Sequence, residues 1–227
     1  MPEKTSLIEK AVAMDSTIGQ RYHPPQQSKK SPTTPTFSGR DHYLLTPLPR
    51  DINWRDIAAH LAKINRYTGA TPLPYSVAQH CVIMCDLSLP ELKPYALLHD
   101  AHEAYINDLS APFKAALQLI CPQAIKAIKH IEYLQDTAIY AAANLTYPVP
   151  DYIKRRIKEL DLAMASAEIE QLLCRPARDN VPAAKTIIRV KSWGDAEDQF
   201  MARLEQWVFP HIRINDHNKT PPEAPKG

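Results

Sequence analysis

Helical periodicity of the apolar residues constrains the fold of this chain more than any other feature of its sequence. Along most of the chain, apolar side chains recur three or four positions apart, as they do on the buried face of an amphipathic helix. Residues 53–67 illustrate the pattern, because Ile57, Leu61 and Ile64 share one face and Asn53 has the side chain of an N-cap. The pattern predicts an all-α domain of about six or seven helices. Further helices are expected over residues 74–87, 90–106, 110–122, 122–145, 150–174 and 195–212.

The proline distribution marks the expected limits of this domain. The chain has 21 prolines and 5 glycines, and the prolines gather at the ends and in the connecting segments, as in helices joined by stiff turns. Residues 1–36 are expected to form a flexible arm and residues 214–227 a disordered tail, since both contain polar, proline-rich stretches. The helical domain then spans residues 37–213. Within it, residues 38–49 suggest a turn or short hairpin, and residues 183–194 a short strand or an irregular loop.

Charge and cysteine content exclude several classes of protein. A net charge of +2 gives no strong electrostatic case for a nucleic-acid or membrane partner, and no stretch is long and apolar enough to span a membrane. The four cysteines form no C-x-x-C pair, which argues against a zinc knuckle or a thioredoxin-type motif. Cys81 and Cys85 lie one helical turn apart and are expected to be core residues. A reducing, cytoplasmic compartment fits this usage.

Polar residues occupy the apolar faces of three predicted helices. A lone buried carboxylate is penalised by several kcal/mol unless it is paired, so three such faces would each be costly on their own. The economical explanation is that the three faces meet at one point. The inward-facing polar residues are His80 in the second helix, His99, Asp100 and Glu103 in the third, and Asp161 in the sixth.

Two imidazoles and two carboxylates around one point would suit a divalent transition metal, with positions left open for water and substrate. Each residue also has a simpler interpretation when taken alone. His80 could be a hydrogen-bonded core histidine, Asp161 could pair with a nearby arginine, and His99 with Asp100 could be an orienting pair. Their joint occurrence on apolar faces favours the metal site. His102 points away from this arc and is expected at the surface or behind the ligands.

The same residues resemble the ordered H…HD…D pattern of the HD-domain metal-dependent phosphohydrolases. The resemblance rests on SVAQHCV at residues 76–82, ALLHDAHEAYINDLSAPFK at residues 96–114 and ELDLA at residues 159–163, and it covers residues 37–172. It is strongest to the compact bacterial and phage branch, which includes 5′-deoxynucleotidases and phage enzymes that hydrolyse dATP. It implies an HD-domain helical bundle in a cytoplasmic, bacterial or phage-encoded homo-oligomer, which the small residues of AIYAAAN would also suit.

The resemblance also implies a role for each matched residue. One divalent ion (Co, Mn, Zn or Mg) would be bound, Glu103 would activate or orient the attacking water, and Asp108 would assist near the scissile phosphate. Arg66 would hold phosphate, Tyr67 would stack on sugar or base, and Lys114 would contact phosphate. Departures from the family pattern at His60, Ala70 and Ala111 concern substrate choice. The implied metal ligands are His80, His99, Asp100 and Asp161.

The expected function is metal-dependent hydrolysis of deoxynucleotides. Deoxynucleoside triphosphates are favoured, with dATP as a candidate, because the arrangement SGR…NRYTG…YSVAQH most resembles the phage branch. Lys114, Lys126 and Lys129 could supply positive charge for a triphosphate, although the last two could equally form a solvated helix face. Three alternatives remain open: a 5′-deoxynucleotidase acting on dNMPs, a phosphodiesterase of cyclic nucleotides, and a non-catalytic regulatory HD module.

Overall fold

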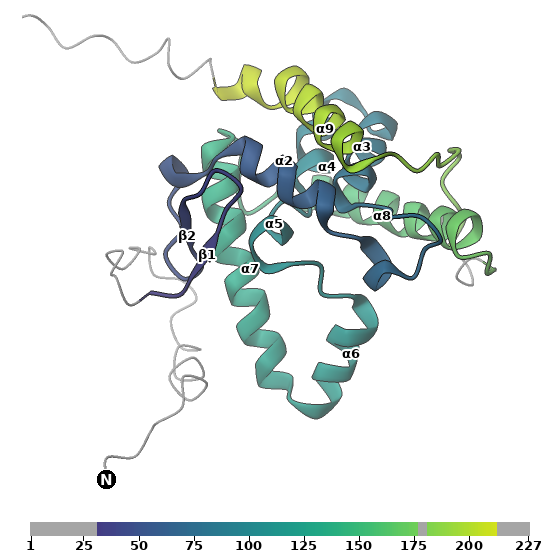
Figure 1. Ribbon diagram of the computed structural model, residues 1–227, viewed down its shortest axis with the longest axis horizontal. Helices are drawn as coiled ribbons and strands as arrows, with labels where there is room; N and C mark the ends of the chain where they lie inside the picture. Colours follow the sequence, from purple (N-terminus) through teal and green to yellow (C-terminus); the bar gives the residue numbers. More distant parts are fainter. Residues whose placement is uncertain (1–30, 177–180, 213–227) are drawn as a thin grey trace, which may run out of the picture.

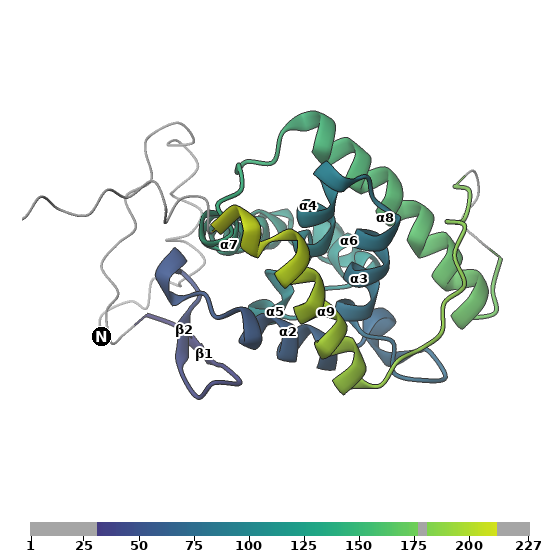
Figure 2. The ribbon, with the colours of Figure 1, turned by 90° about the horizontal axis from the view of Figure 1, so that it is seen from above.

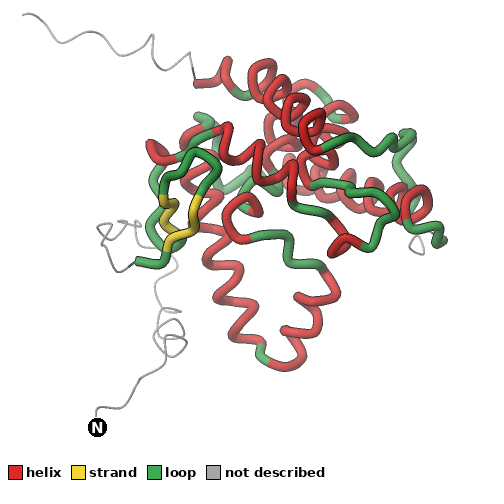
Figure 3. The backbone as a smooth tube through the Cα atoms, viewed as in Figure 1, coloured by secondary structure: helices red, strands yellow, loops and turns green. Residues whose placement is uncertain are grey.

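A computed structural model describes residues 31–176 and 181–212, and these segments are mostly helical (Figures 1 and 3). The predicted all-α class is therefore confirmed. Three 3₁₀ turns accompany the α-helices: η1 (Pro49–Asp51), η2 (Arg66–Gly69) and η3 (Pro90–Leu92). In chain order, the α-helices are α2 (Trp54–Lys63), α3 (Val77–Leu87), α4 (Lys93–Leu98), α5 (Glu103–Ile106), α6 (Ala111–Ile120), α7 (Pro122–Ala142), α8 (Asp151–Leu172) and α9 (Trp193–Trp207).

Side-chain caps fix the starts of three helices. The side chain of Asn53 accepts a hydrogen bond from the amide of Arg55 at the start of α2, as the sequence predicts. Ser76 and Ser192 cap α3 and α9 in the same way. Each cap satisfies an amide at the helix start that has no partner inside the helix.

The segment predicted as one helix over residues 90–106 divides into two. In a continuous α-helix, the carbonyl of Ala96 would accept from the amide four residues later. Here it accepts a hydrogen bond from Nδ1 of His99 at 2.8 Å. Helix α4 ends at Leu98, and a turn follows whose amides bond to carbonyls three residues back, for example Glu103 to Asp100. The break therefore falls at the His99–Asp100 pair.

Helix α9 lies across α2 and α3, and α3 also packs on α4 and α8 (Figure 2). The apolar faces of these helices form one core, which includes the fully buried Ile57, Leu97, Met164 and Phe200. Cys81 and Cys85 are buried in this core as predicted. Since α3, the turn after α4 and α8 carry the inward polar residues, the packing of α3, α4 and α8 places those residues close together.

The hairpin that precedes α2 begins inside the segment predicted as a flexible arm. Strand β1 (Thr33–Pro35) pairs antiparallel with β2 (Asp41–Tyr43), and Gly39 has the positive φ of 78° that the turn requires. The folded part thus starts before residue 37. The rest of the predicted arm, residues 1–30, and the predicted tail lie outside the described residues.

Helices α6 and α7 form an antiparallel pair that extends from the rest of the molecule (Figure 1). No residue of α6 is buried, although the helix is mostly apolar. Residues 183–192, the region where a strand or loop was predicted, form an irregular connection before α9. Within the described parts of the chain, no helix combines the length and apolarity needed to cross a bilayer.

Candidate metal centre

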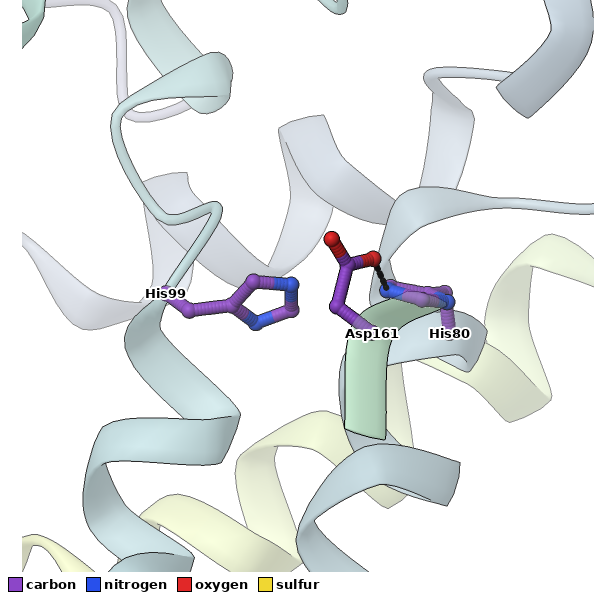
Figure 4. A group of neighbouring side chains, drawn as sticks. All are labelled: His80, His99 and Asp161. Carbon is purple, nitrogen blue, oxygen red and sulfur yellow. Dashed lines mark ion pairs between the residues drawn. The ribbon is translucent and has the colours of Figure 1, made fainter. Parts of the chain in front are cut away.

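The four predicted ligands meet where α3, α8 and the turn after α4 come together. His80 lies on α3, Asp161 lies near the middle of α8, and His99 and Asp100 lie in the turn. Nε2 of His80 is 3.6 Å from Oδ1 of Asp161 and 3.9 Å from Oδ2 of Asp100, and Nε2 of His99 is 3.1 Å from the same Asp100 oxygen. Figure 4 shows Asp161 between the two imidazoles. The sequence-based prediction that these residues converge is confirmed.

Both histidines have one ring nitrogen committed to an acceptor outside this cluster. Nδ1 of His80 is 2.6 Å from Oε1 of Glu168, and Nδ1 of His99 is 2.8 Å from the carbonyl of Ala96. Because both partners are acceptors, Nδ1 carries a hydrogen in each ring, and Nε2 is the nitrogen that has the lone pair when the ring is neutral. The two Nε2 atoms are buried and have no well-aligned hydrogen bond among the described residues. This is the state in which a neutral histidine binds a metal ion.

The two carboxylates of the cluster are held in their charged form. Burial alone would raise the pKa of Asp100, but His99, His80 and Arg66 lower it below its usual range. Burial also opposes ionisation of Asp161, whereas His80, His99 and Lys158 lower its pKa. Asp161 pairs with Lys158 at 2.8 Å. The alternative pairing of Asp161 with a nearby arginine is not what the structure shows, since Arg156 bonds to Glu159.

This donor set fits a divalent transition ion. Two imidazole nitrogens and two carboxylate oxygens are ligands that zinc, manganese and cobalt accept, and an ion with five or six coordination positions would keep room for water or substrate. The ligand atoms of His80, His99 and Asp161 all lie within 4.8 Å of one another. Cys81 forms a second close group with His99 and Asp100, but burial raises the pKa of its thiol and disfavours the thiolate that binds metal.

Glu103, the predicted catalytic acid, is buried beside this cluster as the first residue of α5. Its Oε2 atom is buried and has no hydrogen-bond partner among the described residues. Burial raises its pKa well above the usual range, and the charges of Asp100 and Asp108 raise it further. A carboxyl group in such surroundings binds a proton more tightly than a solvated one, which suits general acid–base catalysis.

Asp108 and Lys114, also predicted at the site, lie on its α6 side. Asp108 follows Asn107, whose φ of 70° turns the chain at the end of α5. Burial raises the pKa of Asp108, and its charge acts on Glu103. The amine of Lys114 is 2.7 Å from Oε1 of Glu132 on α7. Lys114 is therefore paired with a carboxylate of α7, the helix that packs against its own helix α6.

Arg66 and Tyr67 lie in the 3₁₀ turn η2, beyond the end of α2, so the predicted helix over residues 53–67 is too long. Tyr67 and Thr68 have φ values of 56° and 55°. Such left-handed backbone costs about 1–2 kcal/mol per non-glycine residue. The hydroxyl of Tyr67 donates to Oε2 of Glu168 at 2.7 Å, and Arg66 donates to the same oxygen at 3.0 and 3.2 Å. These bonds hold the strained turn against α8.

Glu168 is the residue that the sequence analysis missed. It is fully buried on α8 and bonds to His80, Arg66, Tyr67 and Tyr75. Burial would raise its pKa, but His80 and Arg66 dominate and lower it to about 2. A usable signal was present, since Glu168 follows Asp161 by seven residues, or two helical turns, and so lies on the same face of α8.

His102 is not a surface residue, contrary to one of the two interpretations given above. Its side chain is 12% exposed, and Nδ1 lies 3.0 Å from Oδ1 of Asp136 on α7. Tyr147 donates to the other oxygen of Asp136 at 3.4 Å. His102 thus links the turn that carries the ligands to α7.

The chain resembles two bacterial proteins, both named as uncharacterised. It is 35% identical over 175 residues to YfdR of Escherichia coli (strain K12), which covers 74% of this chain and 92% of YfdR. It is also 35% identical over 145 residues to RCAP_rcc00048 of Rhodobacter capsulatus, which covers 60% of this chain and 70% of that protein. No protein-family model matches the chain.

Proposed function

We propose that this chain, which belongs to the same protein family as YfdR, is a metal-dependent phosphohydrolase of deoxynucleotides. One observation carries the proposal. The buried Nε2 atoms of His80 and His99 have no well-aligned hydrogen bond among the described residues, although they lie 3.6 Å from Asp161 and 3.1 Å from Asp100. One buried oxygen of Glu103, whose carboxyl group interacts electrostatically with Asp100 and His99, is likewise without a partner there. Buried polar groups without partners are rare, so these atoms are explained most simply as ligands and a proton acceptor. The resemblance to HD-domain phosphohydrolases supports the same interpretation.

Each residue has a defined task in this proposal. A divalent ion held by His80, His99, Asp100 and Asp161 would lower the pKa of bound water and neutralise phosphate charge. Glu103 accepts a proton from the attacking water, because its raised pKa makes its carboxylate a stronger base than a solvated one. Asp108 assists from the loop after α5.

The proposed substrate contacts are Arg66 and Tyr67, both in the turn η2. Nη1 of Arg66 lies 3.7 Å from Oδ2 of Asp100, so this edge of the guanidinium is directed to the metal centre and can contact phosphate. The ring face of Tyr67 is the proposed contact for sugar or base. Its hydroxyl is already bonded to Glu168.

Two substrate classes remain in competition. Deoxynucleoside triphosphates, with dATP as a candidate, are proposed from the resemblance to the phage branch. The pairing of Lys114 with Glu132 and of Arg66 with Glu168 favours the second class, deoxynucleoside monophosphates, because a triphosphate tail carries more negative charge to neutralise.

A substrate panel separates these possibilities. Protein freed of metal with a chelator and reloaded with Mn²⁺ or Co²⁺ would be incubated with dNTPs, dNMPs and cyclic nucleotides, and the products resolved by anion-exchange chromatography. Loss of triphosphate or phosphate groups from deoxynucleotides, only in the reloaded protein, is the expected result. A metal-loaded protein that hydrolyses none of them would instead support the non-catalytic regulatory module, and cleavage of cyclic nucleotides alone would support the phosphodiesterase.

A further inference from the structure

Glu168 is the most heavily bonded side chain among the described residues around the metal centre. Its Oε1 atom lies 2.6 Å from Nδ1 of His80 and accepts from the hydroxyl of Tyr75 at 2.9 Å. Its Oε2 atom accepts from Arg66 and from the hydroxyl of Tyr67. A fully buried carboxylate with so many donors is stable in its charged form and in a single orientation.

We infer that Glu168 is a positioning residue, which directs Nε2 of His80 at the metal and fixes Arg66 in the orientation that faces the site. This inference rests on the metal site of the proposed function. A carboxylate behind a ligating histidine selects the ring tautomer, fixes the ring plane and makes the other nitrogen a stronger donor. His80 has no other hydrogen-bond acceptor on Nδ1 among the described residues, so Glu168 alone provides these effects for it.

The same carboxylate binds one edge of the Arg66 guanidinium and leaves the other edge facing the metal centre. Nε and Nη2 bond to Oε2 of Glu168, whereas Nη1 lies near Oδ2 of Asp100. Arg66 could not rotate without breaking two charge-assisted hydrogen bonds in a buried site. Glu168 therefore couples the metal ligand on α3 to the proposed phosphate contact on η2.

The test compares Glu168→Gln with Glu170→Gln in the full-length protein. Glu170 is exposed and lies two residues further along α8, so its variant controls for the loss of one carboxylate on this helix. Co²⁺ is titrated into metal-free protein by calorimetry, and the visible absorption of the Co²⁺ complex is recorded at saturation. The Kd for Co²⁺ should rise by about tenfold to a hundredfold in Glu168→Gln, with an altered spectrum, and should stay at the wild-type value in Glu170→Gln.

A second variant controls for charge and for folding. Glu168→Gln alone leaves Arg66 as a buried, partly unpaired cation, which can unfold the protein. The double variant Arg66→Gln with Glu168→Gln removes both charges, so the net charge around the site does not change. If Glu168 acts through its bond to His80, this double variant also binds Co²⁺ at least tenfold more weakly than wild type.

The inference is overturned if either folded variant binds Co²⁺ with wild-type affinity and spectrum, even when its melting temperature falls, because Glu168 would then serve stability alone. The experiment does not depend on turnover. Failure of wild-type protein to bind Co²⁺ would refute the metal site itself, and failure to hydrolyse nucleotides with normal Co²⁺ binding would refute only the proposed reaction.

Discussion

Nδ1 of His80 lies 2.6 Å from Oε1 of Glu168, a residue 88 positions away in the chain. The bond joins α3 to α8 in the interior of the protein. Because the hydrogen is on Nδ1, Nε2 of His80 presents its lone pair to Asp161 and Asp100. His99 is oriented in the same way by the carbonyl of Ala96. Two histidines from different elements thus direct their free nitrogens to one point.

Protein purified without chelators should contain about one equivalent of a divalent metal per chain, and His99→Ala should lose most of it. Removal of one of four ligands leaves a site with too few donors to retain the ion through purification. Elemental analysis provides the measurement. His130→Ala is a matched control, since His130 is exposed on α7 and should not affect metal content. Full metal content in His99→Ala would exclude His99 as a ligand.

Metal affinity should increase as pH rises through the neutral range. Burial alone would lower the pKa of His99, but Asp100 raises it well above its usual value, so the metal-free protein holds a proton there. Metal binds only the neutral ring, so this proton must leave. Below the raised pKa, the Kd for Co²⁺ should fall by about tenfold for each unit of pH increase, because one proton is released. Calorimetric titrations at pH 6.0, 6.5 and 7.0 check this, and a Kd that does not change with pH would contradict it.

Acid should destabilise the metal-free protein through Glu168. Its pKa of about 2 lies below the usual 4.5. The carboxylate therefore stabilises the fold fully above about pH 4.5, and this contribution is lost as pH falls towards 2. Between pH 6 and pH 3, the free energy of unfolding of wild type should fall by about 2 kcal/mol more than that of Glu168→Gln, by the linkage of pKa shift to stability. Urea titrations at the two pH values measure the difference. An equal fall in both proteins would mean that Glu168 is not held charged.

A homo-oligomer is still predicted, but the surface expected to form the contact between copies is a different one. Ala138 near the end of α7 and Ala143 just after it belong to the small-residue stretch, and both are buried in the protein's own core. In contrast, Leu119 and Ile120 of α6 are 87% and 82% exposed. Light scattering at micromolar concentration should show an assembly larger than a monomer. If α6 contributes to the contact between copies, Leu119→Lys should shift the protein towards the monomer, and a monomeric wild type would refute the prediction.

The sequence predicted the helices and the convergence of the candidate metal ligands for one physical reason. Burial of an apolar face imposes a period near 3.6 residues, and a polar residue on that face must find a partner inside the protein. His80 and Asp161 each stand out against such a face. The same reasoning applies to Glu168, which lies two helical turns beyond Asp161 on the same apolar face of α8.

Two features could not be read from the sequence. The left-handed turn at Tyr67 and Thr68 contains no glycine at either position, and it is held by bonds to α8, about a hundred residues away. The break in the third predicted helix depends on the hydrogen bond from the His99 side chain to a backbone carbonyl. The first depends on tertiary contacts and the second on a local bond from a side chain to the backbone, and helix propensity encodes neither.

Hydrolysis of deoxynucleotides by metal-loaded Glu103→Gln, compared with wild type at equal metal content, tests the central claim most directly. Gln cannot accept the proton of the attacking water but has nearly the same shape, so the fold, the metal and substrate binding should persist. Wild type should release phosphate groups, and turnover of the variant should be lower by about 10² to 10⁴, as for loss of a general base. Equal turnover in the two proteins, or no turnover by metal-loaded wild type on any deoxynucleotide, would contradict the account.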